Sequence, residues 1–358
     1  MAASQKKLKV FTVVISIFIA VILGEVILRI FIPTENNFRL WAPNLNFTFE
    51  PDSTVIKGIQ GKSQFTINSE GLRGDENKAV LAIGGSTTIE MFLDNKETWT
   101  HFLNAANAGK NGLNSFHHID QMKILLEQFP KTGTVIILMG VNDLQLQIVR
   151  GKYTAGDSLE RYNKTFQVLP DHYFSWYKRS GYWKLFRNIK HTFYTKATNE
   201  MVLDKDGKVL IKHRNFRTAC KQKIDTLPNW NEALEGYKNN INTLIAIAKE
   251  KHVELIFATQ PVLWNSNNTV HQEDLMWMGG IGDFQENGGQ YYTSKVLDES
   301  MKLFNKTLME SASAQGIKVI DLYALLPKDE SIFYDDCHFT ELGARKVAEE
   351  IGKVINTK

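Results

Sequence analysis

A serine, a histidine and an aspartate occupy positions from which the chain could build a nucleophilic site. Ser86 follows two glycines at the end of an apolar run, and Asp335 precedes His338 by three residues at the start of a C-terminal helical pattern. A serine hydroxyl needs a general base, and an imidazole base needs a carboxylate that fixes its tautomer. We therefore predict that Ser86 attacks an acyl carbonyl, with His338 as general base and Asp335 as the residue that orients it.

Two glycine-containing segments could supply hydrogen-bond donors to the oxyanion that such an attack creates. They are Asn107-Ala108-Gly109-Lys110-Asn111-Gly112 and Met139-Gly140-Val141-Asn142-Asp143. Oxyanions are stabilised by N–H groups held in place before the reaction begins. We predict an oxyanion hole made of the backbone N–H groups of Ser86 and Gly112 and the side-chain amide of Asn142. Taken alone, each segment is better interpreted as an ordinary turn, so the prediction depends on their joint occurrence.

The elements that would position these segments alternate between strands and helices from residue 78 onward. Apolar runs predict strands at 79–83, 105–108, 134–139, 253–259 and 318–322, and helical spacing predicts helices at 114–129, 231–251, 292–315 and 340–356. This alternation indicates an α/β fold with a parallel sheet between helices. The loops at the carboxyl ends of parallel strands meet at one edge of the sheet, where ligands bind.

Taken together, the four segments resemble the SGNH (GDSL-type) hydrolase superfamily, whose four blocks supply a serine, a glycine, an asparagine and a histidine. The residues in these blocks are Ser86, Gly112, Asn142 and His338, with Asp335 in the Asp-x-x-His motif. The resemblance covers about residues 68–356. It includes the lead-in Asn68-Ser69-Glu70-Gly71-Leu72-Arg73-Gly74, which looks like that of membrane-anchored, exported members.

This resemblance implies a three-layer α/β/α, flavodoxin-like sheet and a carboxylic ester hydrolase that forms an acyl-enzyme, with no metal or organic cofactor. The chain departs from the family at Gly84-Gly85-Ser86-Thr87, where Gly-Asp-Ser-Leu is usual. The missing aspartate is not part of the triad, but its loss removes a carboxylate that stabilises the loop. We expect O-acyl (acetyl) esters of carbohydrate, or lipid esters, as substrates. The alternatives are an O-acyltransferase to a sugar hydroxyl and a non-catalytic scaffold that retains the fold.

The N-terminus carries an apolar run from Val10 to Ile32 that follows Lys6, Lys7 and Lys9. About 20 apolar residues span a bilayer, and flanking lysines favour the cytoplasmic side. We predict a signal anchor within residues 1–33, a single-pass helix with a cytoplasmic N-terminus and an exported catalytic domain. A cleaved signal peptide is the alternative, although no A-x-A site follows the run. Inside the run, Glu25 and Arg29 are four residues apart, so on a helix they can pair.

Beyond the anchor, the pattern predicts a β-rich lead-in at 34–77 and a hydrolase domain at 78–358 with an insertion or cap at about 145–229. The insertion contains an aromatic and basic stretch from Tyr173 to Lys196. This stretch could cover the active site, contact a membrane surface or stack on sugars, or its aromatic rings could simply pack on the domain.

Composition and charge exclude several other classes. The chain has 42 basic and 39 acidic residues, and this balance argues against a nucleic-acid partner. Its two cysteines, Cys220 and Cys337, are too far apart in the sequence for a CxxC site; they could form a disulfide or remain free thiols. The expected partners are therefore an ester substrate and, through residues 10–32, a membrane, and the sequence predicts no oligomeric state.

Overall fold

The computed structural model of the chain describes residues 2–32, 40–41, 43–74, 76–150, 175–186, 189, 206–282 and 289–355. The chain divides into two compact units. One comprises Met1–Phe38 and Tyr162–Leu203, and the other comprises Arg39–Arg161 and Asp204–Lys358. The predicted division into anchor, lead-in and hydrolase domain stays a prediction.

The larger unit is built on a five-stranded parallel sheet, which confirms the predicted α/β fold. Its strands are β3 (Val80–Gly84), β4 (Ala106–Asn107), β5 (Thr134–Leu138), β6 (Glu254–Ala258) and β7 (Lys318–Ile320). They lie in the order β4-β3-β5-β6-β7, and all neighbours are parallel. This is the flavodoxin-like order, and the chain reverses its direction of winding between β3 and β5. All residues of β5 are buried, as expected for a strand covered on both faces.

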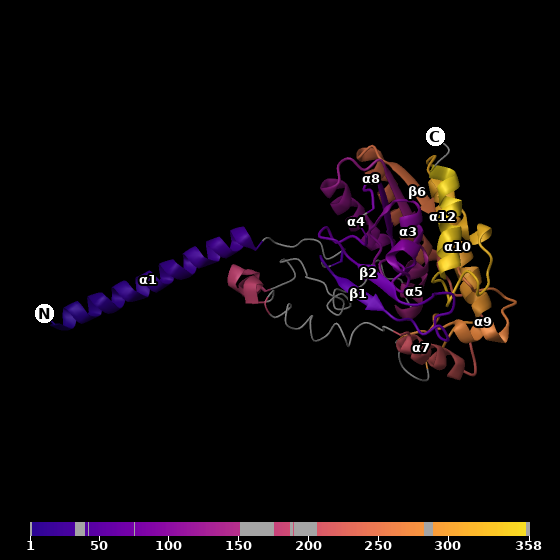
Figure 1. Ribbon diagram of the computed structural model, residues 1–358, viewed down its shortest axis with the longest axis horizontal. Helices are drawn as coiled ribbons and strands as arrows, with labels where there is room; N and C mark the ends of the chain where they lie inside the picture. Colours follow the sequence, from indigo (N-terminus) through magenta and orange to yellow (C-terminus); the bar gives the residue numbers. More distant parts are fainter. Residues whose placement is uncertain are drawn as a thin grey trace. The chain divides into compact units, whose positions relative to one another are not determined.

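Helices cover both faces of this sheet (Figure 1). On one face, α4 (Ser115–Gln128), α8 (Asn231–Glu250) and α10 (Ser294–Ser313) pack side by side, and on the other α3 (Trp99–Phe102) packs against α12 (Glu341–Ile355). The four helices expected from periodicity are therefore present. In α12, Val347 and Ile351 are buried, but Leu342 is 46% exposed, because it lies off the helical stripe that these two residues share.

The lead-in contributes a separate antiparallel pair, β1 (Asn46–Phe49) and β2 (Ser63–Thr66). Its inward side chains Phe49 and Phe65 are fully buried and meet edge to face, with ring centroids 5.9 Å apart. The stretch predicted as a β-rich lead-in thus contains one antiparallel pair of strands.

The region predicted as an insertion begins inside α5 (Val141–Arg150), whose second residue is Asn142. Its residues 151–174, 187–188 and 190–205 lie outside the described part of the chain, and they include part of the aromatic and basic stretch from Tyr173 to Lys196. Its last part contains α7 (Lys208–Ala219), which contacts α9 (Val270–Leu275) within the larger unit.

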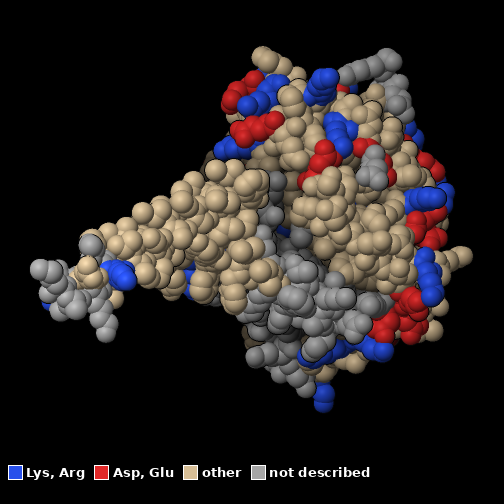
Figure 2. Space-filling view, turned by 60° about the vertical axis from the view of Figure 1, so that its left-hand side comes forward, with Lys and Arg blue, Asp and Glu red and all other residues tan. Residues whose placement is uncertain are grey.

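The smaller unit contains α1 (Ala2–Phe31), a helix of 30 residues. Its stretch Lys9–Phe31 is long and apolar enough to cross a membrane, and none of its most apolar window is buried in the protein. Figure 2 shows an almost uncharged surface along this helix, whereas basic and acidic side chains are interspersed over the globular part. The same unit holds η4 (Trp176–Arg179) and a helical segment at 181–186.

Candidate active site

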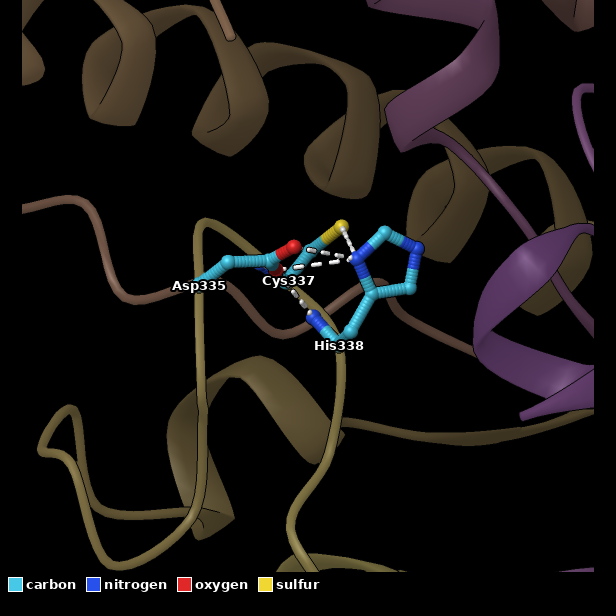
Figure 3. Close-up of side chains that lie close together, drawn as sticks. All are labelled: Asp335, Cys337 and His338. Carbon is cyan, nitrogen blue, oxygen red and sulfur yellow. Dashed lines mark hydrogen bonds and ion pairs between the residues drawn. The ribbon is translucent and has the colours of Figure 1, made fainter. Parts of the chain in front are cut away.

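Asp335 and His338 lie together in the loop before α12 (Figure 3). The ring Nδ1 of His338 is 2.7 Å from Oδ2 and 2.9 Å from Oδ1 of Asp335. The backbone N–H groups of Cys337 and His338 also donate to Oδ1. The carboxylate of Asp335 therefore stabilises the backbone of its own loop. Figure 3 shows the other ring nitrogen directed away from the carboxylate. The i,i+3 spacing therefore gives the contact expected from the sequence.

The pKa values of this pair move in opposite directions. Burial alone would raise the pKa of Asp335 and lower that of His338. The opposite charges and the hydrogen bonds between the two groups outweigh burial, so that the pKa of Asp335 lies below its usual range and the pKa of His338 well above it. Asp335 is therefore ionised at neutral pH and favours a protonated imidazole.

A tryptophan that the sequence analysis did not identify completes the surroundings of Asp335. The indole Nε1 of Trp277 donates to Oδ2 of Asp335 over 3.0 Å, and its backbone N–H donates to Oδ2 of Asp336 over 2.8 Å. The ring of Trp277 lies against His213 of α7, with centroids 5.6 Å apart. The ring of His338 in turn stacks on Tyr334, with an interplanar angle of 12°. Each member of the Asp–His pair is thus in contact with an aromatic side chain.

Ser86 begins the short helix α2 (Ser86–Ile89) directly after β3, at the carboxyl edge of the sheet. It is half-buried and lines the same pocket as Asp335 and His338. The preceding residue must be small, because a Cβ on Gly85 would lie 2.2 Å from Nδ2 of Asn142. The space that a side chain at position 85 would need is therefore filled by the amide of Asn142.

The residues predicted as oxyanion donors gather around this turn. Nδ2 of Asn142 donates to the backbone O of Leu113 over 2.8 Å, which leaves one amide hydrogen for a ligand. Gly112, next to Leu113, has a φ of +74°, and a Cβ there would meet no atom within 4 Å. Among the described residues, the backbone N–H groups of Ser86 and Gly112 have no hydrogen-bond partner. Three N–H donors can thus serve this edge of the sheet.

A buried arginine from the lead-in binds the backbone that follows Ser86. Arg73 is 2% exposed, and its guanidinium donates to the backbone oxygens of Ile89, Glu90 and Leu93, just beyond Ser86. Its Nε also donates to Oδ1 of Asn95 over 3.0 Å. The last backbone oxygens of the short helix α2 have no partner within the helix, and the guanidinium of Arg73 supplies hydrogen bonds to them. The Gly-Leu-Arg-Gly segment of the lead-in therefore stabilises the turn that carries Ser86.

The pocket itself has a volume of about 280 Å³. The late part of the predicted insertion forms part of its wall, because Val209, Leu210 and His213 of α7 line it. Arg214 fixes α7 to the loop of Asp335, since its guanidinium donates to the backbone oxygens of Tyr334 and Val55, each over 2.7 Å. The full lining is Ser86, Met91, Phe92, Asn111, Val209, Leu210, His213, Trp277, Tyr334, Asp335 and His338.

Asp335, Cys337 and His338 bring three potential metal-ligand atoms within 4.8 Å of one another. Their chemistry does not fit a metal well. Burial raises the pKa of the Cys337 thiol to about 11, and metals bind the thiolate. The oxygens of Asp335 already accept hydrogen bonds from Trp277, Cys337 and His338. Cys220 and Cys337 are both free thiols, so the disulfide considered from the sequence is not formed.

No protein-family model and no curated protein sequence matches the chain. Among solved structures, the chain is similar to a member of the lipolytic G-D-S-L family from Veillonella parvula, with 12% identity, 78% of this chain and 98% of that chain covered, and a TM-score of 0.39. It is also similar to a putative acylhydrolase from Bacteroides fragilis, with 13% identity, coverage of 79% and 88%, and a TM-score of 0.39. A third similar structure is an acetylxylan esterase from Geobacillus stearothermophilus, with 11% identity, coverage of 78% and 94%, and a TM-score of 0.37.

Proposed function

We propose that the chain is a serine ester hydrolase of the SGNH type. The observation that carries the proposal is the Asp335–His338 pair, hydrogen-bonded at 2.7 Å and facing the same pocket as Ser86. The amide of Asn142, which lies against Gly85, supports it further. These residues come from three separate loops of one sheet edge, and a binding protein would not need this combination.

In the proposed mechanism, Oγ of Ser86 attacks the ester carbonyl while Nε2 of His338 takes the hydroxyl proton. Asp335 holds Nδ1–H and stabilises the imidazolium that forms. The negative charge on the carbonyl oxygen is received by the N–H groups of Ser86, Gly112 and Asn142. The C–O bond to the alcohol then breaks, and His338 returns the proton to the leaving oxygen. Water, deprotonated by His338, attacks the acyl-enzyme and releases the acid and Ser86.

Replacing Asn142 by alanine is expected to lower kcat by about 100- to 1,000-fold while leaving KM nearly unchanged, because the amide would act on the oxyanion and hardly on the bound ester. Steady-state kinetics on nitrophenyl acetate with the full chain in detergent measure both constants. Asn111→Ala is the matched control, since Asn111 lines the same pocket but has no assigned role in the reaction. An Asn142→Ala enzyme with the turnover of the Asn111→Ala enzyme would contradict the assignment.

For the substrate, we propose O-acyl esters of carbohydrate, with acetyl esters first, or lipid esters. Aromatic rings of Phe92, Tyr334 and Trp277 line the pocket beside the aliphatic Val209 and Leu210. Such a lining suits a sugar face or a short acyl chain. We further propose that α1 anchors the enzyme in a membrane, with the N-terminus cytoplasmic and the site on the other side.

The proposal is tested by hydrolysis of nitrophenyl esters from acetyl to octanoyl by the full chain in detergent. We expect turnover that depends on Ser86 and falls with chain length beyond what about 280 Å³ can accept. A parallel reaction with an added sugar acceptor shows whether the acyl group passes to water or to a hydroxyl. Transfer to the sugar in preference to water would replace the hydrolase by the acyltransferase. A folded protein without turnover on any ester, with or without acceptor, would favour the scaffold.

A further inference from the structure

In the smaller unit, hydrogen bonds to the carboxylate of Glu25 and to the backbone of Val21 attach the aromatic segment 175–186 to α1. Oε1 of Glu25 accepts the backbone N–H of Gly181 over 2.8 Å as well as Nε of Arg29 over 2.8 Å. Oε2 of Glu25 lies 3.4 Å from the backbone N of Tyr182, whose hydroxyl donates to the backbone O of Val21 over 3.2 Å. Glu25 therefore pairs with Arg29, as expected from their spacing, and also binds a segment more than 150 residues further along the chain.

The two elements touch closely, and glycines make this possible on both sides. A Cβ on Gly24 would lie 1.9 Å from the hydroxyl oxygen of Tyr182, and a Cβ on Gly181 would lie 2.7 Å from Cβ of Leu28. Gly24, Glu25 and Leu28 are half-buried, whereas residues 9–23 of the helix are exposed. The contact is thus confined to one short stretch of α1.

The place of this stretch along α1 fixes its depth in a bilayer. Glu25 lies sixteen residues after Lys9, which corresponds to about 24 Å of helix, and the hydrocarbon core is about 30 Å thick. Glu25 would therefore lie near the far boundary of the core when the lysines lie at the near one. A carboxylate at that depth is costly unless it is paired. Arg29 and the N–H groups of Gly181 and Tyr182 supply the pairing.

The segment presents to its surroundings the residue types that favour the boundary between water and lipid. Trp176 is 83% exposed, Phe186 55% and Tyr177 49%. Tyr177 and Trp183 meet edge to face at 6.2 Å, and the ammonium group of Lys178 lies within 6 Å of both rings. Exposed aromatic rings beside basic groups are typical of membrane interfaces, where rings lie at the level of the headgroups.

We propose that residues 175–186 form an interfacial element that docks on the membrane anchor and inserts its aromatic rings among the lipid headgroups at the far end of α1. Of the four uses considered for this stretch from the sequence, this assigns the contact with a membrane surface. The element gives the anchor a second attachment to the bilayer. This inference rests on the proposed anchoring of α1 in a membrane and not on the proposed reaction.

The test uses the full chain in phosphatidylcholine–phosphatidylglycerol vesicles that contain brominated lipid, which quenches tryptophan fluorescence by contact. The fluorescence lost in a Trp176→Phe/Trp183→Phe double variant isolates the two rings from the other five tryptophans. We expect this component to be quenched strongly by lipid brominated near the headgroup and weakly by aqueous iodide. Strong quenching by iodide without quenching by lipid would overturn the proposal.

A second pair of variants tests the docking itself. Gly24→Leu keeps the helix apolar but places a side chain where the Tyr182 ring lies, whereas Ala20→Leu adds the same bulk at an exposed position of α1. We expect Gly24→Leu to reduce the lipid quenching of the two tryptophans and Ala20→Leu to leave it unchanged. Equal quenching in both variants would show that the segment does not dock on α1.

Discussion

A Ser86→Ala enzyme is expected to lose hydrolysis of nitrophenyl acetate by roughly three to six orders of magnitude in kcat, down to the level left by binding and oxyanion contacts alone. The reason is chemical, because Ser86 carries the only aliphatic hydroxyl among the residues that line the pocket. Ser86 is half-buried and its hydroxyl makes no hydrogen bond in the described part of the chain, so its removal should hardly affect folding. Steady-state kinetics and thermal unfolding of the same preparation separate the two effects.

A surface serine provides the matched control for this experiment. Ser313, the exposed last residue of α10, loses the same atom in Ser313→Ala and should keep wild-type kinetics. A fluorophosphonate adds a direct measurement, because it labels an activated serine covalently. Wild type and Ser313→Ala should gain the mass of one adduct, and Ser86→Ala should gain none. Full turnover by a folded Ser86→Ala enzyme would refute the mechanism.

The sheet and the grouping of the four blocks could be predicted because both depend on local pattern. The run Thr134–Leu138 is apolar at each inner position and is followed by a glycine, so strand and turn can be recognised without knowledge of neighbours. Once the strands are parallel, their carboxyl ends must meet at one edge, which brings Ser86 and Asn142 together. The Asp335–His338 contact needs only a spacing of three residues.

The support around the pair could not be predicted, because it depends on contacts between residues far apart in sequence. Trp277 is 58 residues from Asp335 and lies in a loop without periodicity, where nothing distinguishes it from an ordinary buried tryptophan. Arg214 is 120 residues from Tyr334, whose backbone oxygen it binds. Gly85 is a related case. The sequence shows only that a carboxylate is missing at this position. The structure shows that the amide of Asn142 occupies the space that a side chain there would need.

Replacing Asp335 by asparagine is expected to lower kcat by about 10⁴-fold, although the two side chains have the same shape. An amide cannot accept all the N–H groups that now point at the carboxylate from Trp277, Cys337 and His338, and it would favour the wrong imidazole tautomer. It also removes the charge that raises the pKa of His338.

The sign of the accompanying pH effect follows from that charge. His338 acts as a base only when it is neutral, so wild-type kcat/KM should rise with pH and level off above the usual histidine pKa of about 6.5. In Asp335→Asn, burial of the imidazole is no longer opposed by the carboxylate, and the acidic limb of the residual activity should move to lower pH.

Asp336→Asn is the neighbouring control for this last prediction. Asp336 accepts from Trp264 and from the backbone of Trp277 and Met278, and it makes no hydrogen bond to the His338 ring in the described structure. Its replacement should lower the unfolding temperature but keep the pH profile of the wild type. A loss of stability alone would therefore leave the acidic limb of the pH profile unchanged. Only the loss of the charge beside His338 would shift that limb. An unshifted limb in Asp335→Asn would mean that Asp335 does not set the pKa of the catalytic base.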